Sequence, residues 1–370
     1  MSYEEDPPTA LNIAYLGPEA SFSHQAAIEV FTPSSSSSAT LHPLPSFSSI
    51  FSVIQCSPNS GPNADQTQTS YDYAVIPIEN STNGSVVQVL DLLAQCGLDS
   101  DALYPDIEVC AEYYLPVHHC LFISPASPAS PASPTLTTSA AAAAAVTLAS
   151  SKSSIRTLYT HPQVWGQCTR FLSTHFPPTH VERIDVGSTS AAAQLVAREP
   201  TKGLTAAIGS KLAGEKHNLV CLAENIEDEP GNNTTRFFVV RNRMRKPKGP
   251  LRDTFSQQQQ QQSTDTIRKA KYKSLITFTI PHTKPGALAD ALAVFKTHSF
   301  NLTSIDTRPS RKRNWQYVFF VECEEADNYT AGNGEAGPEV EDNLKNMLTH
   351  LEKFTERLRY LGRFKDQLET

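Results

Sequence analysis

A short polar segment stands directly before the apolar run 237–240 and consists of Asn233, Thr234, Thr235 and Arg236. A hydroxyl beside a guanidinium, at the start of a predicted strand, suits a site that binds a carboxylate and polarises one of its oxygens. Because Asn-x-Thr is also common in turns, the segment has weight only together with other polar clusters.

Three further polar segments each follow a predicted strand and precede a predicted helix: 17–23, 77–85 and 187–190. Hydroxyls at a helix start cap free backbone N–H groups, and such groups also bind anions. One segment of this kind is most often only a cap. Three at equivalent junctions favour a single ligand cleft, because open α/β sheets bind ligands at the carboxyl ends of their strands.

A fourth cluster, 160–168, surrounds another predicted helix start, and Gln167 either reaches the cleft or bonds locally. His118, His119 and His161 lack the spacing of metal ligands, so we interpret them as structural or capping residues. Neither a G-x-G-x-x-G nor a P-loop motif occurs, which argues against a nucleotide cofactor. We expect no metal and no cofactor.

Strand-like and helix-like patterns alternate through the larger, N-terminal part of the chain. This alternation predicts parallel sheets with crossover helices. The predicted strands are 12–16, 73–76, 155–159 and 204–208, and the predicted helices are 23–31, 86–95, 164–174 and 191–198.

The C-terminal part has a different order of elements, βαββαβ, which is that of a ferredoxin-like domain. Domains of this size often bind effectors or partners. The predicted strands are 275–280, 302–307, 317–322 and 358–364, and the predicted helices are 287–297 and 339–354.

Low-complexity stretches divide the chain of 370 residues. The run 34–38 reads as a loop expansion, and the Ser-, Pro- and Ala-rich stretch 124–154 as an insertion that cannot bury enough apolar surface to fold by itself. The glutamine tract 257–262 lies within a polar linker. We therefore predict a first domain over 11–240, a linker over 241–271 and a second domain over 272–366.

Composition limits the class of protein. The formal net charge is −7 and the mean hydropathy is −0.33, so nucleic acid is a poor partner, and no apolar run approaches the length of a membrane span. Seven cysteines without CxxC spacing favour a reducing compartment. The acidic N-terminus lacks the apolar core of a secretory signal. We predict a soluble, cytoplasmic protein.

Taken together and in order, these clusters resemble the prephenate dehydratase family, whose motifs are a GPxGTFS-like loop, PIENSxxGxV, HPQ…QC, STxAA, AAIGS and NxTRF. Here the corresponding stretches, between Leu16 and Phe237, read GPEASFS, PIENSTNGSV, HPQVWGQC, STSAAA, AAIGS and NTTRF. The C-terminal part looks like the family's ACT regulatory domain. The resemblance implies an α/β protein with a two-lobed, periplasmic-binding-protein-like catalytic domain and a ferredoxin-like βαββαβ ACT domain.

The resemblance further implies conversion of prephenate to phenylpyruvate with loss of water and carbon dioxide, and no metal or cofactor is required. Thr235 would hydrogen-bond or protonate the leaving hydroxyl, and Arg236 would bind a carboxylate, with a structural salt bridge as the alternative role. Glu79 would orient donors instead of facing the dianionic substrate. The substrate-binding residues would be Ser21, Glu79, Asn80, Ser81, Thr160, Gln167, Ser188 and Thr189.

Phenylalanine, the end product of the pathway, is the effector that the resemblance implies. Its site would lie at Gly286, Ala287 and Leu288, with Thr307 and Arg308 as the second contact across a dimer interface. The family's Glu-Ser-Arg-Pro element is Asp-Thr-Arg-Pro here, which leaves the strength of the response open. The implied assembly is a homodimer or homotetramer.

Two other functions fit the same residues. An arogenate dehydratase performs the same chemistry on the aminated substrate, and one changed contact is enough to accept an ammonium group. A non-catalytic amino-acid sensor would use the lobes and the ACT domain for binding alone, and retention of Thr235 beside Arg236 argues against it.

Overall fold

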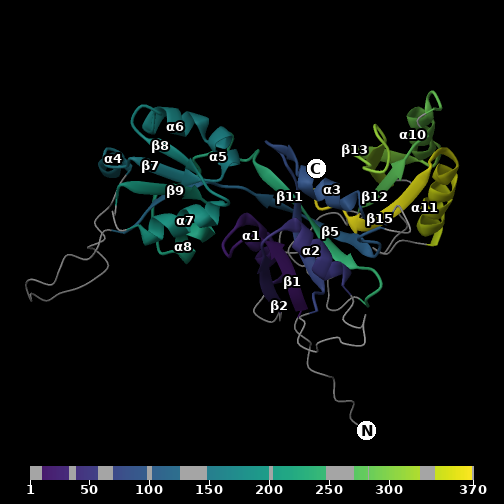
Figure 1. Cartoon of the computed structure of the whole chain (residues 1–370), viewed down its shortest axis with the longest axis horizontal. Helices are drawn as coiled ribbons and strands as arrows, with labels where there is room; N and C mark the ends of the chain where they lie inside the picture. Colours follow the sequence, from purple (N-terminus) through teal and green to yellow (C-terminus); the bar gives the residue numbers. More distant parts are fainter. Residues whose placement is uncertain are drawn as a thin grey trace, which may run out of the picture.

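The computed structural model describes residues 11–32, 39–56, 70–97, 102–125, 148–199, 203–246, 271–281, 283–325 and 338–368. These residues form two lobes and a third unit, each built on one sheet (Figure 1). The runs 34–38 and 257–262, and most of the predicted insertion and linker, lie outside the described residues. Within these ranges no helix is long and apolar enough to span a membrane.

The sheet of the first lobe is mixed. Its spatial order is β2-β1-β3-β11-β5, and β4 pairs with β3. β1 pairs in parallel with β2 and β3, whereas β11 is antiparallel to both β3 and β5. The predicted parallel arrangement is therefore right for three strands and wrong for the others. The bounds are β1 Leu11–Leu16, β2 Ala39–Leu44, β3 Tyr73–Asn80, β4 Gly84–Ser85, β5 Ile107–Pro116 and β11 Thr234–Asn242.

Helices cover both faces of this sheet, and the two-residue alternation of β3 supplies side chains to each. On one face α1 (Phe22–Phe31) packs over Tyr73 and Val75. On the other, α2 (Phe47–Gln55) and α3 (Val87–Leu93) pack over Ala74 and Ile76. Both cores are closed to solvent.

The second lobe repeats the plan with the strand order β10-β6-β9-β7-β8. Its strands are β6 Cys120–Ile123, β7 Thr157–Thr160, β8 Glu182–Asp185, β9 Thr205–Gly209 and β10 Val220–Ala223. Its helices are α4 Leu148–Ser151, α5 Pro162–Gln167, α6 Thr169–His175, α7 Thr189–Arg198 and α8 Lys211–Lys216.

The single helix predicted over 164–174 is two helices, because the backbone leaves the helical region at Cys168, where φ is −123°. The Asp228 carboxylate accepts the free N–H groups of Thr169 and Arg170, both at 2.8 Å. A carboxylate at a helix N-terminus also complements the helix dipole, so the break is stabilised from a distant segment.

The chain crosses between the lobes twice, through 117–119 after β5 and through 224–233 before β11. The two crossings are bonded together: the Val117 N–H donates to the carbonyl of Asn233 at 2.8 Å, and the Ile226 N–H to that of His119 at 3.0 Å. Paired crossings of this kind form a hinge, and the architecture is the two-lobed, periplasmic-binding-protein-like one that the resemblance implied.

The C-terminal unit has the βαββαβ order of an ACT domain, with the sheet order β13-β14-β12-β15 and antiparallel pairing throughout. Helix α10 begins and ends at the residues that the sequence predicted. The elements are β12 Tyr272–Thr279, α10 Ala287–Thr297, β13 Phe300–Pro309, β14 Tyr317–Glu325, α11 Pro338–Leu351, a 3₁₀ turn Glu352–Phe354 and β15 Arg357–Lys365.

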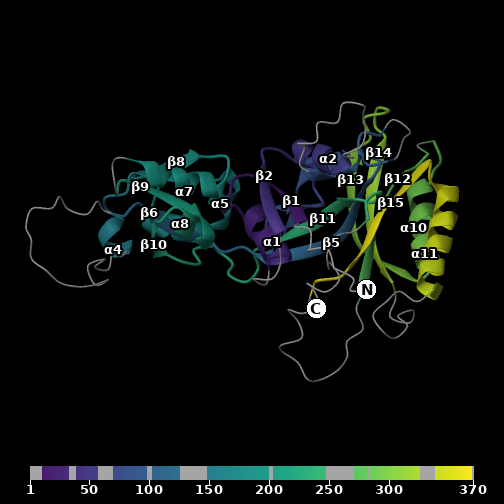
Figure 2. The same ribbon diagram turned by 90° about the horizontal axis from the view of Figure 1, so that it is seen from below.

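The ACT sheet lies with its helices on one face and the first lobe on the other (Figure 2). Leu275 and Phe320 share a buried cluster with Phe238 of β11. The approach is close at Gly362 of β15, where a Cβ would lie 2.0 Å from the carbonyl oxygen of Val109. The absence of a side chain there lets the two sheets meet.

Candidate functional site

The polar side chains of the Asn-Thr-Thr-Arg segment divide between two faces at the start of β11, because neighbouring residues of a strand point to opposite faces. Thr235 pairs in register with Asn80 at the end of β3, and Arg236 with Glu79. The structure therefore separates Thr235 and Asn80 from Arg236 and Glu79. The period of two in the sequence already indicated this separation.

Thr235 accepts a hydrogen bond from the side-chain amide of Asn80, whose Nδ2 lies 3.0 Å from Thr235 Oγ1. The same nitrogen lies 2.9 Å from Asn233 Oδ1. The other end of the amide is occupied too: Asn80 Oδ1 accepts the backbone N–H groups of Thr82 and Asn83, both at 3.0 Å. Because backbone N–H groups can only donate, the amide orientation is determined, and the hydroxyl proton of Thr235 stays free to donate.

Gln167 is the residue of the second lobe that contacts Asn80. Its Nε2 lies 3.5 Å from Asn80 Oδ1, and its Oε1 lies 2.6 Å from His119 Nε2. His119 belongs to the hinge crossing, is buried, and stands edge-on to Phe22 at the start of α1, with ring centroids 5.7 Å apart. Burial lowers the pKa of His119, although Gln167 and Glu227 act in the opposite direction. The sequence interpretation of His119 as merely structural did not anticipate this contact.

Two helix N-termini from opposite lobes flank the same region. Ser21 caps α1 by accepting from the His24 N–H, and Ser188 caps α7 by accepting from that of Ala191. The loop before α1 meets the start of α7, where the Ser190 hydroxyl donates to the Glu19 carbonyl at 2.5 Å.

Thr189, the first residue of α7, is buried against β9. The fit depends on Gly209, where a Cβ would lie 3.2 Å from the Thr189 carbonyl oxygen. Each of these two helices is ten residues long, so each presents a partial positive charge at the junction of the lobes.

Three predicted binding residues use their side chains elsewhere. The Thr160 hydroxyl is fully buried and donates to the Ile208 carbonyl at 2.8 Å. The Ser81 hydroxyl donates to the Asn232 carbonyl and accepts the Thr234 N–H at 2.9 Å, so it positions β11. Glu79 is exposed and lines a cavity of about 30 Å³ on the ACT side of the lobe.

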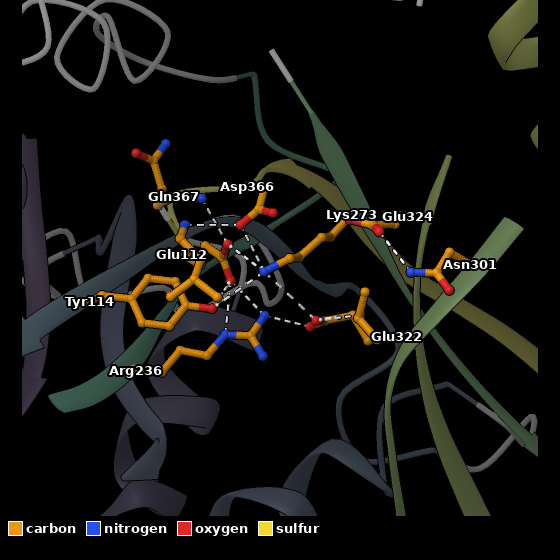
Figure 3. Close-up of polar contacts among 11 residues, drawn as sticks. Glu112, Tyr114, Arg236, Lys273, Asn301, Glu322, Glu324, Asp366 and Gln367 are labelled. Carbon is orange, nitrogen blue, oxygen red and sulfur yellow. Dashed lines mark hydrogen bonds and ion pairs between the residues drawn. The ribbon is translucent and has the colours of Figure 1, made fainter. Parts of the chain in front are cut away.

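Arg236 points into a buried cluster of charges between the first lobe and the ACT domain (Figure 3). Its Nε and Nη2 lie 2.8 and 2.5 Å from Glu112 Oε2, and Nη2 also bonds Glu322 of β14. Lys273 of β12 lies 3.2 Å from Glu112 and 2.8 Å from Asp366. We call these five residues the interdomain ion cluster. In this structure Arg236 has the structural role that the sequence left open as its alternative.

Burial and neighbouring charge act on the cluster in opposite directions. Burial raises the pKa of Glu112, although Arg236 and Lys273 oppose the rise. Burial would lower the pKa of Arg236, but Glu322 and Glu112 raise it on balance. The arginine is thus a permanent cation on which two carboxylates depend.

The predicted effector residues lie toward the same end of the ACT sheet, because Phe319 of β14 pairs both with Phe278, near the end of the strand that leads to Gly286, and with Thr307 of β13. Gly286 precedes α10 with a φ of +80°, a conformation that favours glycine. Ala287 is buried and Leu288 half-buried, whereas Thr307 of β13 is exposed. Arg308 reaches the first lobe, with its Nε 2.5 Å from Asp91 of α3. In the described ranges no group of three or more His, Cys, Asp or Glu residues is arranged to hold a metal.

Two sequence models of known families match this chain. The sequence model of prephenate dehydratase matches residues 13–245, and that of the ACT domain matches residues 274–331. A probable prephenate dehydratase of Saccharomyces cerevisiae is 34% identical over 333 residues, which cover 84% of this chain and 86% of that protein. A bifunctional chorismate mutase/prephenate dehydratase of Aquifex aeolicus is 29% identical over 354 residues, covering 96% and 73%.

Among solved structures, the prephenate dehydratase of Arthrobacter aurescens in complex with L-Phe superposes with a TM-score of 0.65. It is 22% identical, and the match covers 96% of this chain and 90% of that one. At this identity the likeness shows the fold alone.

Proposed function

Because this chain belongs to the prephenate dehydratase family, we propose that it converts prephenate to phenylpyruvate in phenylalanine biosynthesis. The bond from the ring to the carboxylate breaks and releases carbon dioxide, and its electron pair enters the ring. The ring hydroxyl is expelled as hydroxide, and one proton taken up from solvent converts it to water. Aromatisation drives both departures. The enzyme must hold two carboxylates and assist the leaving oxygen.

The observation that carries this proposal is the state of the Thr235 hydroxyl. Its oxygen accepts from the Asn80 amide, which leaves its proton available to donate to a substrate oxygen in the junction of the lobes. A threonine is too weak an acid to ionise freely, so its role is positioned donation to the leaving hydroxyl as negative charge develops there.

The two substrate carboxylates need partners other than Arg236, whose guanidinium is occupied in the interdomain ion cluster. The N-termini of α1 and α7, capped by Ser21 and Ser188, supply free backbone N–H groups from opposite lobes. We assign the carboxylates to these two termini, with Thr189 at the start of the second.

The test is product analysis with both candidate substrates. Purified protein is incubated with prephenate or with arogenate, and phenylpyruvate and phenylalanine are followed. We expect phenylpyruvate from prephenate, and a loss of about 100- to 1,000-fold in kcat for Thr235→Val, which keeps the shape and removes the donor. Phenylalanine from arogenate would identify the aminated substrate instead, and no product from either would favour the sensor.

We further propose that phenylalanine regulates the enzyme through the ACT domain, near Gly286–Leu288 and Thr307. The ACT surface that carries these residues is tied to the first lobe through Arg308 and Asp91, and through Asp306 and Ser85 at 3.2 Å. An effector that binds one docking arrangement better than another shifts the population of lobe arrangements.

Feedback is tested on the full chain by measuring kcat/KM for prephenate with increasing phenylalanine, and with tyrosine as the matched control. We expect inhibition by phenylalanine and a weaker effect of tyrosine. If millimolar phenylalanine leaves turnover unchanged, the regulatory proposal fails while the catalytic one stands.

A homodimer or homotetramer in the cytoplasm completes the proposal. Strand β13 lies at the edge of the ACT sheet and exposes Ile305 to 50%, which supports pairing with a second copy. All seven cysteines are free, in keeping with a reducing compartment. Sedimentation velocity with and without phenylalanine measures the assembly, and a monomer under both conditions would contradict it.

A further inference from the structure

His119 lies in the hinge crossing between β5 and β6 and is held from several sides. Its backbone N–H donates to Glu227 at 2.9 Å, and its ring is 1% exposed beside Phe22. One ring nitrogen, Nε2, bonds Gln167, whereas the other, Nδ1, has no hydrogen-bond partner within the described part of the chain. A buried polar atom without a partner is costly, so packing alone does not explain a histidine here.

The direction of every hydrogen bond from Asn80 to His119 follows from the backbone. Asn80 Oδ1 accepts two backbone N–H groups, so the group of Gln167 that faces this oxygen must be the NH₂ group. The Gln167 carbonyl oxygen then faces His119, and His119 Nε2 must carry a proton to donate to it. Burial lowers the pKa of His119 and favours the neutral ring, and a neutral ring with its proton on Nε2 has none on Nδ1.

We propose that His119 is a positioning residue, which donates from Nε2 to Gln167 and thereby holds the Gln167 and Asn80 amides in the orientation that leaves the Thr235 proton free for the leaving hydroxyl. This inference rests on the proposed dehydratase reaction. It differs from a structural role because only the donor, and not the shape of the ring, is required.

The same row of contacts joins the two lobes. Thr235 and Asn80 come from the first lobe, Gln167 from the second, and His119 from the crossing between them. The contact of 3.5 Å between Gln167 and Asn80 is the longest in the row. It is therefore the contact that closure of the lobes about the hinge would shorten, and the threonine proton is best directed when the lobes are closed.

Loss of the His119 donor should slow turnover without abolishing it, because two backbone N–H groups also hold Asn80. Small misplacements of a catalytic group cost up to about 100-fold, so we expect His119→Phe to lower kcat by between about 10- and 100-fold. The phenylalanine keeps the edge-on contact with Phe22 and removes the donor. KM should change little, since His119 is buried and bonds Gln167 instead of facing the open junction.

Two variants control for shape and for the neighbouring histidine. His119→Gln retains an N–H donor for Gln167, and we expect it to restore kcat to within about threefold of the unsubstituted enzyme. His118→Phe is the matched control, because His118 is half-exposed and bonds only Glu227. Full kcat in His119→Phe, or equal losses in the Phe and Gln variants, would overturn the positioning role.

A double-mutant cycle and a spectroscopic measurement complete the test. If His119 acts through Gln167, the double variant His119→Phe/Gln167→Met should lose no more kcat than the worse single variant, and additive losses would refute the linkage. In ¹⁵N-histidine NMR the signals of His119 are assigned as those missing from the spectrum of His119→Phe. They should show a proton on Nε2 and none on Nδ1. The opposite tautomer would exclude the proposed direction of donation.

Failure of this inference can be told from failure of the proposed function. An unsubstituted enzyme that turns over neither prephenate nor arogenate would remove the reaction on which the positioning role rests. An active enzyme whose His119→Phe variant is equally active would refute the positioning role alone.

Discussion

Replacing Arg236 with methionine distinguishes an arginine that joins domains from one that binds substrate. The interdomain ion cluster contains two cations and three carboxylates, all buried or nearly so. Without Arg236, Lys273 is left with Glu112, Glu322 and Asp366. Removing one member of a buried pair costs about 3–5 kcal/mol, so we expect Arg236→Met to lower the free energy of unfolding by that amount.

The partner variant Glu322→Gln should cost much less. It leaves two cations with two carboxylates, and the glutamine carbonyl can still accept from the Arg236 guanidinium, so the loss is about 1–2 kcal/mol. In the double variant the costs should not add, because both changes break the same contact. The number of charges that remain unpaired in the cluster thus determines which of the two single variants loses more stability.

Unfolding in guanidinium chloride measures both effects, and steady-state kinetics with prephenate on Glu322→Gln and Arg236→Lys tests the substrate role. We expect KM values close to that of the unsubstituted enzyme. If Arg236 bound a substrate carboxylate, its replacement would remove a charged hydrogen bond worth about 1.5–3 kcal/mol. That loss would raise KM by at least about tenfold. An Arg236→Met variant of unchanged stability with such a rise in KM would refute the reasoning.

Three further variants test the site and the domain contact. Thr235→Val should lose only about 1 kcal/mol of stability in chemical unfolding while kcat falls by about 100- to 1,000-fold; parallel losses would indicate a folding defect. Gly362→Ala should lower the free energy of unfolding by about 1–3 kcal/mol or more. The new Cβ would lie 2.0 Å from the Val109 carbonyl oxygen, and the φ of Gly362 is +144°. Gly166→Ala is the control, because a Cβ there would have nothing within 4 Å. The pKa of His119 is lowered in the folded state, so the unfolded chain takes up the proton first as the pH falls. Below about pH 6.5 the free energy of unfolding of the unsubstituted protein should therefore fall by up to about 1.4 kcal/mol per pH unit relative to that of His119→Gln. Equal pH profiles of stability would show that His119 does not titrate in this way.

Local sequence patterns were sufficient to predict those helices and strands whose ends are marked by residues within the same segment. Helix α10 was predicted residue for residue, because Gly286 ends the preceding loop and a regular apolar face follows. The βαββαβ order of the ACT domain followed from the same patterns. Strands β5 and β6 were not predicted, since Glu112 and the histidine pair interrupt an apolar pattern that is completed only by β11 and β9.

Residue types and their order along the chain also identified the polar segments and the family to which they belong. The period of two within β11 separates Thr235 from Arg236, which the sequence patterns had placed in one site. What the sequence did not contain was the identity of each partner. Asn80 and Thr235 are 155 positions apart, and Arg236 and Glu322 are 86 apart.

Tertiary structure decided these partners for two physical reasons. Strand register brings Asn80 opposite Thr235, and a register depends on the packing of whole sheets. Burial then decides the chemistry: in water Arg236 would be a free cation and His119 a titrating base, but between the packed sheets each must find its hydrogen-bond and charge partners. The sequence by itself determined which groups are present, and only the fold determined which of them face the junction of the lobes and which hold the domains together.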